Sequence, residues 1–229
     1  MTANPARNAP IAAKRFEFTG KKSTARDYDV LMKIISIALI IMAALAVGQT
    51  NRLSDKEQRA VKEVERLGGT FAWVSQDDEK LLSLDVDNKT KVFDFGKLKD
   101  IKSLRVLRIF QGKIDESSLI HLPKIPKLEL LVVTSDGLTD KGAKSIGKLV
   151  SLNKLDLSSK SLTGSGLGEL GSLKSLKRFF LYNTTIVDAD LTPLAKMVWL
   201  EELCLPTTVS DEGLVKLKTS LPKTSIRKF

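Results

Sequence analysis

Apolar side chains return every 24 residues through the second half of the chain. Each 24-residue unit has apolar residues at the spacing L-x-x-L-x-x-L-x-L, and the same positions are apolar from one unit to the next. Side chains two positions apart on a strand point to the same side, so the last two columns predict one short strand per unit. The four columns are Ile101, Ile125, Leu149, Leu173, Met197 and Leu221; Leu104, Leu128, Leu152, Leu176 and Leu200; Leu107, Leu131, Leu155, Phe179 and Leu203; and Ile109, Val133, Leu157, Leu181 and Leu205.

A second apolar pair, with its members three residues apart, follows in the other half of each unit. That spacing suits a short helix on the wall opposite the strands. One unit cannot shield its leucines from water, but stacked units share a continuous core. The sequence therefore predicts an α/β solenoid over residues 81–220, with parallel strands on a concave face and short helices outside. The pairs are Leu119/Leu122, Ala143/Ile146, Leu167/Leu170, Leu191/Leu194 and Leu214/Leu217.

The start of each expected helix carries a recurring motif. Residues 138–143 read L-T-D-K-G-A, residues 209–214 read V-S-D-E-G-L, and residues 186–191 are a looser copy. These stretches resemble the I-T-D-x-G-L signature of bacterial leucine-rich-repeat proteins, although residues 162–167 lack the aspartate and residues 114–119 lack the glycine. The resemblance covers residues 81–229 and implies a leucine-rich-repeat solenoid of the bacterial envelope. We expect the Thr or Ser to cap its helix and the acid to favour the same helix dipole.

The N-terminal part of the chain has a different texture. Residues 1–29 are basic and lack hydrophobic periodicity, which predicts a disordered cytoplasmic tail. Residues 30–48 are almost entirely apolar, with Lys33 the only charge, and are long enough for a transmembrane anchor. The preceding basic residues place the N-terminus in the cytoplasm and the repeats outside it. Ala44-Leu45-Ala46 also fits a signal-peptidase site, so secretion after cleavage near Ala46 stays open.

Both ends of the repeat array require cover. In residues 49–80, Ser54 and Glu57 have capping-box spacing before a helical apolar pattern, and two short strands follow. We interpret this segment as an N-terminal cap made of a helix and a hairpin. Residues 221–229 begin another unit and are interpreted as the C-terminal cap.

Little in the composition points to catalysis. The chain has one cysteine, Cys204, and one histidine, His121, which excludes an internal disulfide and any multi-cysteine or two-histidine metal site. Residues 166–171 match the dinucleotide pattern G-x-G-x-x-G, but Leu167 and Leu170 occupy core columns, so the repeat explains the match. We therefore expect no enzyme activity, no cofactor, no metal, no small-molecule substrate and no nucleic-acid partner.

The concave face remains as the candidate binding surface. Residues between the core columns point out of the solenoid, and five strands about 4.8 Å apart offer a face roughly 20 Å across. Arginine and aromatic side chains are frequent anchors in protein interfaces. We expect an unidentified protein or peptide to bind here. The alternative is an envelope protein that its net charge of +10 holds to anionic lipid or polymer without a specific partner. The candidate contact residues are Arg108, Phe110, Val132, Asp156, Arg178, Phe180 and Tyr182.

Overall fold

The computed structural model describes residues 53–76, 79–87, 93–110 and 114–229. The predicted tail at residues 1–29 and the predicted anchor at residues 30–48 lie outside these ranges. Within them, no helix has the length and hydropathy needed to cross a bilayer.

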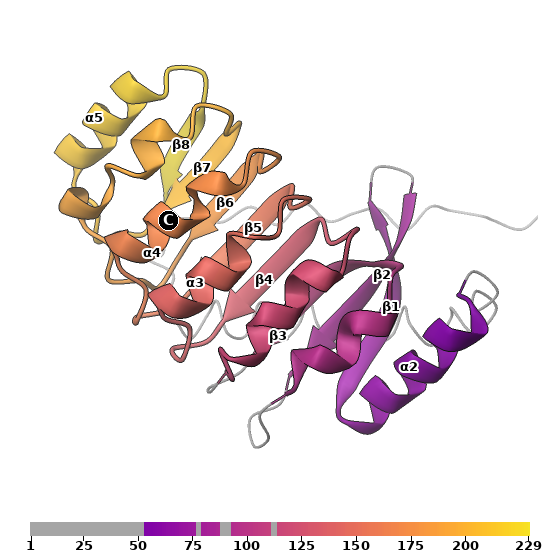
Figure 1. Cartoon of the computed structure of the whole chain (residues 1–229). Coiled ribbons are helices and arrows are strands. Elements are labelled where there is room, and N and C mark those ends of the chain that lie inside the picture. Colours follow the sequence, from indigo (N-terminus) through magenta and orange to yellow (C-terminus); the bar gives the residue numbers. More distant parts are fainter. Residues whose placement is uncertain (1–52, 77–78, 88–92, 111–113) are drawn as a thin grey trace, which may run out of the picture.

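One eight-stranded sheet runs the length of the described molecule in the order β1 to β8 (Figure 1). The first two strands pair antiparallel, and each later strand pairs parallel with the one before it. Val106, Leu130 and Lys154 are successive partners across β3, β4 and β5, so the predicted 24-residue register is confirmed there. The strands are β1 (Gly69–Gln76), β2 (Glu79–Val86), β3 (Leu104–Phe110), β4 (Leu130–Thr134), β5 (Lys154–Ser158), β6 (Arg178–Leu181), β7 (Glu202–Leu205) and β8 (Ser225–Lys228).

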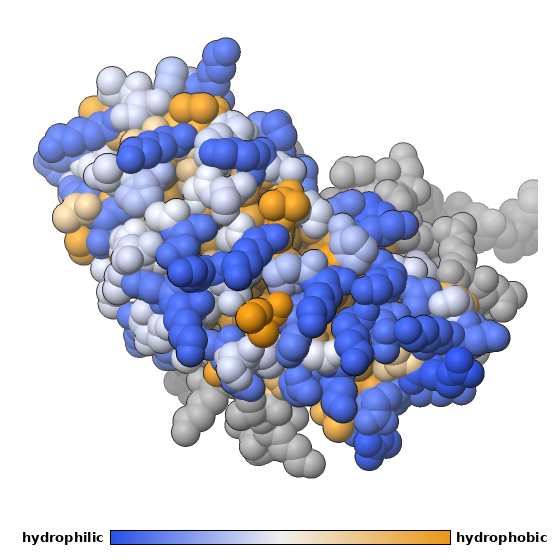
Figure 2. All heavy atoms as spheres, viewed as in Figure 1, coloured by the Kyte–Doolittle hydropathy of each residue, from blue (hydrophilic) through white to orange (hydrophobic). Residues whose placement is uncertain are grey.

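Short helices connect the parallel strands and lie together on one side of the sheet (Figure 1). Their outward surface is largely hydrophilic, with small separate hydrophobic spots (Figure 2). The predicted outer helices are present, although several are 3₁₀ turns instead of α-helices. They are α2 (Asp55–Arg66), η2 (Phe95–Asp100), η3 (Ser118–Lys124), α3 (Asp140–Ile146), α4 (Gly164–Glu169), η4 (Leu170–Ser172), η5 (Asp188–Asp190), η6 (Leu194–Lys196) and α5 (Asp211–Ser220).

The predicted apolar columns form the core between the sheet and the helices. Leu107, Leu131, Leu155 and Phe179 are all fully buried and belong to one continuous cluster. Burying a side chain of this size contributes about 1.5–3 kcal/mol, which explains why units that are unstable alone stack into an array.

Helix α2 lies against the first turn of the array. The predicted capping box is confirmed, because the Ser54 hydroxyl accepts from the Glu57 backbone and the Glu57 carboxylate accepts from the Ser54 backbone. The other oxygen of Glu57 accepts a hydrogen bond of 2.8 Å from the backbone N–H of Ser103. Lys56 forms an ion pair of 2.9 Å with Asp100. These contacts tie α2 to residues 100–103.

The motif acids lie in the first turn of their helices, as predicted, and they also form contacts between turns that the sequence did not predict. Asp140 accepts from the backbone N–H of Thr163 at 2.9 Å and from its hydroxyl at 2.6 Å. Asp188 accepts from the backbone N–H of Ser210 at 2.8 Å. The threonine does cap its own helix, since the hydroxyl of Thr139 accepts from Lys141. Each acid therefore links its turn to the next one.

Candidate protein-binding surface

The structure brings the seven candidate residues onto one face of strands β3 to β6. Arg108, Val132, Asp156 and Phe180 are successive partners, so they form a row across the sheet. Arg178 lies in the neighbouring row with Lys154. Of the remaining two candidates, Phe110 is the last residue of β3 and Tyr182 directly follows β6. Side-chain alternation places these positions opposite the core columns.

The part of this face over β2 to β4 is apolar and internally paired. Val132 is only 4% exposed, and Val106 and Leu81 are also buried. The Arg108 guanidinium forms an ion pair of 2.8 Å with Asp85 and hydrogen-bonds the Ser83 hydroxyl at 3.0 Å. Arg108 and Val132 are therefore engaged within the protein.

The centre of the face is a cluster around Phe180. The Phe180 ring is half-buried, and the Lys154 ammonium lies 4.8 Å from its centroid. The Arg227 guanidinium lies 5.8 Å from the same centroid and pairs with Glu202 at 2.8 Å. Arg178, on the same strand as Phe180, is exposed. We call these five residues the Phe180 cluster.

Sequence reasoning did not select Lys154, Glu202 or Arg227. Lys154 and Glu202 share a row with Arg178, and this row was visible in the repeat. Arg227 was hidden because the last turn is one residue short, which shifts β8 out of the 24-residue count.

Asp156 lies beside the cluster in a poorly solvated position. Its carboxylate is 3.5 Å from the Lys154 ammonium, and its Oδ1 has no hydrogen-bond partner within the described ranges. Burial raises the pKa of Asp156 from 3.8 to about 6, although the Lys154 charge opposes the increase. The carboxylate thus keeps an unused acceptor.

Tyr182 is held in place by two contacts. Its hydroxyl lies 3.3 Å from the Thr134 hydroxyl, and its ring meets Phe229 edge-on with centroids 5.8 Å apart. Burial raises the pKa of Tyr182 to about 12, so the hydroxyl stays protonated at neutral pH. Tyr182 therefore has a fixed position at the edge of this surface, and its hydroxyl is already hydrogen-bonded within the protein.

The remaining reactive side chains have no catalytic arrangement in the described ranges. Cys204 shares the row of Phe180 but is 1% exposed, and burial raises the pKa of its thiol despite the nearby Arg227. His121 contacts the Lys124 ammonium at 3.4 Å. In these ranges no three His, Cys, Asp or Glu side chains are placed to hold a metal ion.

Comparison with known proteins gives similarity at the level of the fold. No protein-family profile and no curated protein matches the chain. Similar solved structures include a leucine-rich-repeat protein of Leptospira interrogans, at 23% identity and a TM-score of 0.46 over 63% of this chain and 36% of that one. Internalin C2 of Listeria monocytogenes has 16% identity and a TM-score of 0.41 over 63% of this chain and 70% of that one. Internalin F of the same species has 15% identity and a TM-score of 0.33 over 62% and 58%.

The chain spans little more than a third of the Leptospira protein. The identities and scores bring no partner or activity to this chain. The assignment of a leucine-rich-repeat fold rests on the chain's own geometry: parallel strands in a 24-residue register over buried leucine columns, with short helices opposite.

Proposed function

We propose that the concave face binds a protein or peptide segment of a partner, with the Phe180 cluster at the centre of the contact. Leucine-rich-repeat folds are typical of protein interaction modules, which use their extended concave surfaces. The observation that carries the proposal is the half-buried Phe180 ring, which has two cations within 6 Å of its centroid and an exposed arginine on the same strand. Buried aromatic and arginine side chains near the centre of an interface provide most of its binding energy.

The charges of the cluster favour an acidic segment. Lys154 and Arg227 each have a carboxylate neighbour, but Arg178 forms no ion pair with any described residue. A guanidinium binds a carboxylate through two parallel hydrogen bonds. A partner segment with an acidic residue next to an aromatic or aliphatic one would engage Arg178 and the exposed part of Phe180 together.

A photo-crosslinking amino acid at position 178 of the full-length protein tests the proposal in cells. The matched control carries the same amino acid at Lys218, an exposed lysine on the outer helix α5. We expect a discrete crosslinked product from position 178 and none from position 218. Phe180→Ala and Arg178→Glu should each reduce the affinity for the crosslinked partner by about 10- to 30-fold, whereas Lys218→Glu should leave it unchanged.

Salt separates this proposal from the surface-association alternative. Specific binding should persist at high ionic strength, since a desolvated aromatic contact is screened less than exposed charges. If moderate salt removes all association and Phe180→Ala changes nothing, the basic charge alone holds the protein to its surroundings, and the specific-partner proposal is wrong.

We further propose that residues 30–48 anchor the chain in a membrane, with the N-terminus in the cytoplasm and the repeats on the other side. The support is the apolar stretch with the single charge Lys33, preceded by a basic segment. Intact mass of the native membrane-extracted protein distinguishes the two forms. The mass of the full-length chain would support the anchor, whereas the mass of a chain that begins after Ala46 would indicate cleavage and secretion.

A further inference from the structure

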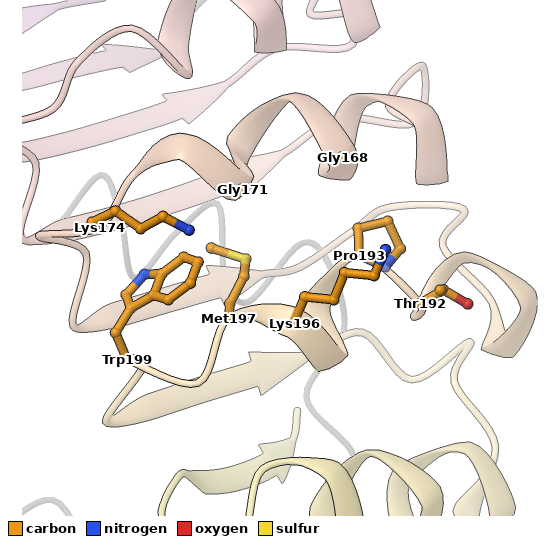
Figure 3. Close-up of a pocket in the computed structure, with 8 residues that line it drawn as sticks. All are labelled: Gly168, Gly171, Lys174, Thr192, Pro193, Lys196, Met197 and Trp199. Atoms are coloured by element: carbon orange, nitrogen blue, oxygen red, sulfur yellow. The ribbon is translucent and has the colours of Figure 1, made fainter.

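The outer wall, on the side of the solenoid opposite the concave face, contains a pocket. It lies between the turn formed by α4 and η4 and the following turn, and its volume is about 430 Å³ (Figure 3). Pockets for small organic ligands usually occupy about 300–1,000 Å³.

Two glycines open this pocket without being required by packing. A Cβ atom at Gly168 or Gly171 would meet nothing within 4 Å. By contrast, a Cβ at Gly166 would collide with the Asp140 carboxylate, and one at Gly147 would collide with the Glu169 carbonyl. Glycine inside a helix costs about 0.5–1 kcal/mol relative to alanine, so two unconstrained glycines weaken this turn. Their effect on the surface is to leave the pocket open.

A tryptophan that breaks the repeat pattern forms another wall. Trp199 occupies a position that is serine or lysine in the other turns. Beside it, Met197 is fully buried and lines the pocket. The Lys174 ammonium lies 3.5 Å from the centroid of the Trp199 ring. The residues at the equivalent position are Ser103, Lys127, Ser151, Ser175 and Lys223.

Two lysines border the pocket without a carboxylate partner. Lys174 and Lys196 both line it, and Figure 3 shows their side chains on either side of Met197. Neither ammonium forms an ion pair with a described Asp or Glu. The positive charge beside this apolar surface is therefore available to an anion.

We propose that this pocket binds a small organic anion with a flat apolar body. The body would lie against the half-buried Trp199 and use the space left by Gly168 and Gly171. The anionic group would be held by Lys196, because the Lys174 ammonium already lies over the Trp199 ring. This site is independent of the concave face, and its occupant is a ligand, with no reaction assigned to it.

The G-x-G-x-x-G match at residues 166–171 acquires a physical explanation on this basis. Gly166 makes room for the carboxylate that links two turns, whereas Gly168 and Gly171 make room in the pocket. Helix α4 has six residues, too few to present the N-terminus that a dinucleotide phosphate uses. The glycines therefore serve two purposes, neither of which is nucleotide binding.

Anthraquinone-2-sulfonate is a suitable probe, because it is flat, anionic and quenches tryptophan fluorescence. The chain has two tryptophans, so Trp73→Phe in the full-length protein leaves Trp199 as the only reporter. We expect saturable quenching of Trp199. The Trp199→Phe protein, which retains Trp73, should show only the linear loss caused by probe absorbance. The uncharged analogue 2-(hydroxymethyl)anthraquinone should bind at least fivefold more weakly.

Substitutions with matched controls test the site itself. Gly171→Leu and Gly168→Leu should fill the pocket and reduce affinity at least tenfold, with thermal unfolding unchanged or raised. Lys196→Gln should weaken the sulfonate several-fold and leave the uncharged analogue unaffected. Lys148→Gln, at the same position two turns earlier, should change neither.

Three results would overturn the proposal. Linear quenching in the Trp73→Phe protein would show that nothing binds. Equal affinity for the uncharged analogue, or equal effects of Lys148→Gln and Lys196→Gln, would show that the pocket does not recognise a negative charge. Undiminished binding in both leucine variants would place the probe elsewhere; should one variant fail to fold, the other decides.

Discussion

Asp140 and Gly166 lie in neighbouring turns, yet each explains the identity of the other. The Asp140 carboxylate occupies the space in which a Cβ of residue 166 would lie. The same relation joins Asp188 to Gly213, and Glu116 to Gly142. At the residue scale, the aspartate and the glycine of the recurring motif are two halves of one contact between turns. A single sequence cannot show this, because the partners are separated by a whole repeat.

A double-mutant cycle on this pair measures the contact. Asp140→Ala removes two hydrogen bonds and should lower the free energy of unfolding by about 1 kcal/mol. Gly166→Ala should cost about 1–3 kcal/mol by overpacking. The double variant should cost less than the sum, since removing the carboxylate relieves part of the collision. Urea unfolding followed by circular dichroism gives all three values.

The control for this cycle lies two residues along the same helix. Gly168→Ala places a Cβ in open space and should be neutral or stabilise by up to about 1 kcal/mol. Strict additivity of Asp140→Ala and Gly166→Ala would contradict the contact.

Asp156 should make stability depend on pH. Folding raises its pKa to about 6, so the folded state holds the proton more tightly than the unfolded state. The resulting stabilisation is complete below pH 4 and is lost as the pH rises through 6. A pKa difference of this size corresponds to at most about 3 kcal/mol. Asp156→Asn should therefore stabilise the protein at pH 8 relative to wild type, and this gain should shrink at pH 4.

Unfolding in urea at both pH values checks this expectation. Asp115→Asn, a change at a half-buried carboxylate outside the sheet that accepts a hydrogen bond from the Ser117 backbone, serves as the comparison. If the free energy of unfolding changes between pH 4 and 7 by the same amount in the wild type and in the Asp156→Asn variant, the pKa of Asp156 is not raised by folding.

At the scale of elements, the strands were predictable and the pairing of surface side chains was not. Each of the strands β3 to β7 contributes two apolar core residues to columns that repeat, and these columns, which include Leu131, Leu155 and Phe179, fix both the place and the register of the strand. The helix type was less predictable, because an apolar pair three residues apart fits a 3₁₀ turn as well as an α-helix.

The details of the candidate site depend on contacts that no repeat encodes. The side chains of Thr134 and Tyr182 meet across two strands, and the Arg227 guanidinium pairs with Glu202 of the neighbouring row. Such contacts follow from side-chain length and rotamer, which the alternation of inward and outward positions leaves open. The face was therefore foreseen, whereas its partition into an apolar part and a charged aromatic centre was not.

Leu155 offers the clearest test of the column interpretation. It is fully buried in the middle strand of the array, between Leu131 and Phe179. Leu155→Ala should lower the free energy of unfolding by about 2–5 kcal/mol, the usual cost of truncating a buried leucine. Asn153→Ala, at an exposed position beside the strand, should change it by less than about 0.5 kcal/mol. Equal effects of the two changes would contradict the register.

At the scale of the whole molecule, the array is a row of units in which each unit mainly contacts its neighbours. Its two proposed binding regions lie on opposite walls of one core, so substitutions in them should act independently. The ends of such a row are its weak points, because an end unit has one neighbour fewer. We propose that residues 49–80 and 221–229 cover these ends, and α2 does contact η2 in the first turn.

Glu57 allows the cover to be loosened without touching the repeats. Burial raises the pKa of its carboxyl, but hydrogen bonds from Ser103 and Ser54 outweigh this and leave the pKa below its ordinary value. The stabilisation from Glu57 is therefore present at neutral pH and is lost as the pH falls through the lowered pKa. Glu57→Ala should increase amide hydrogen exchange in residues 93–110 at pH 7 and leave residues 178–229 unchanged, because coupling in a solenoid passes between neighbours. Glu65→Ala, an exposed change on the same helix, should alter neither region. A uniform increase along the whole array would mean that the described turns unfold as one cooperative unit, and the role of α2 as a local cover would have to be abandoned.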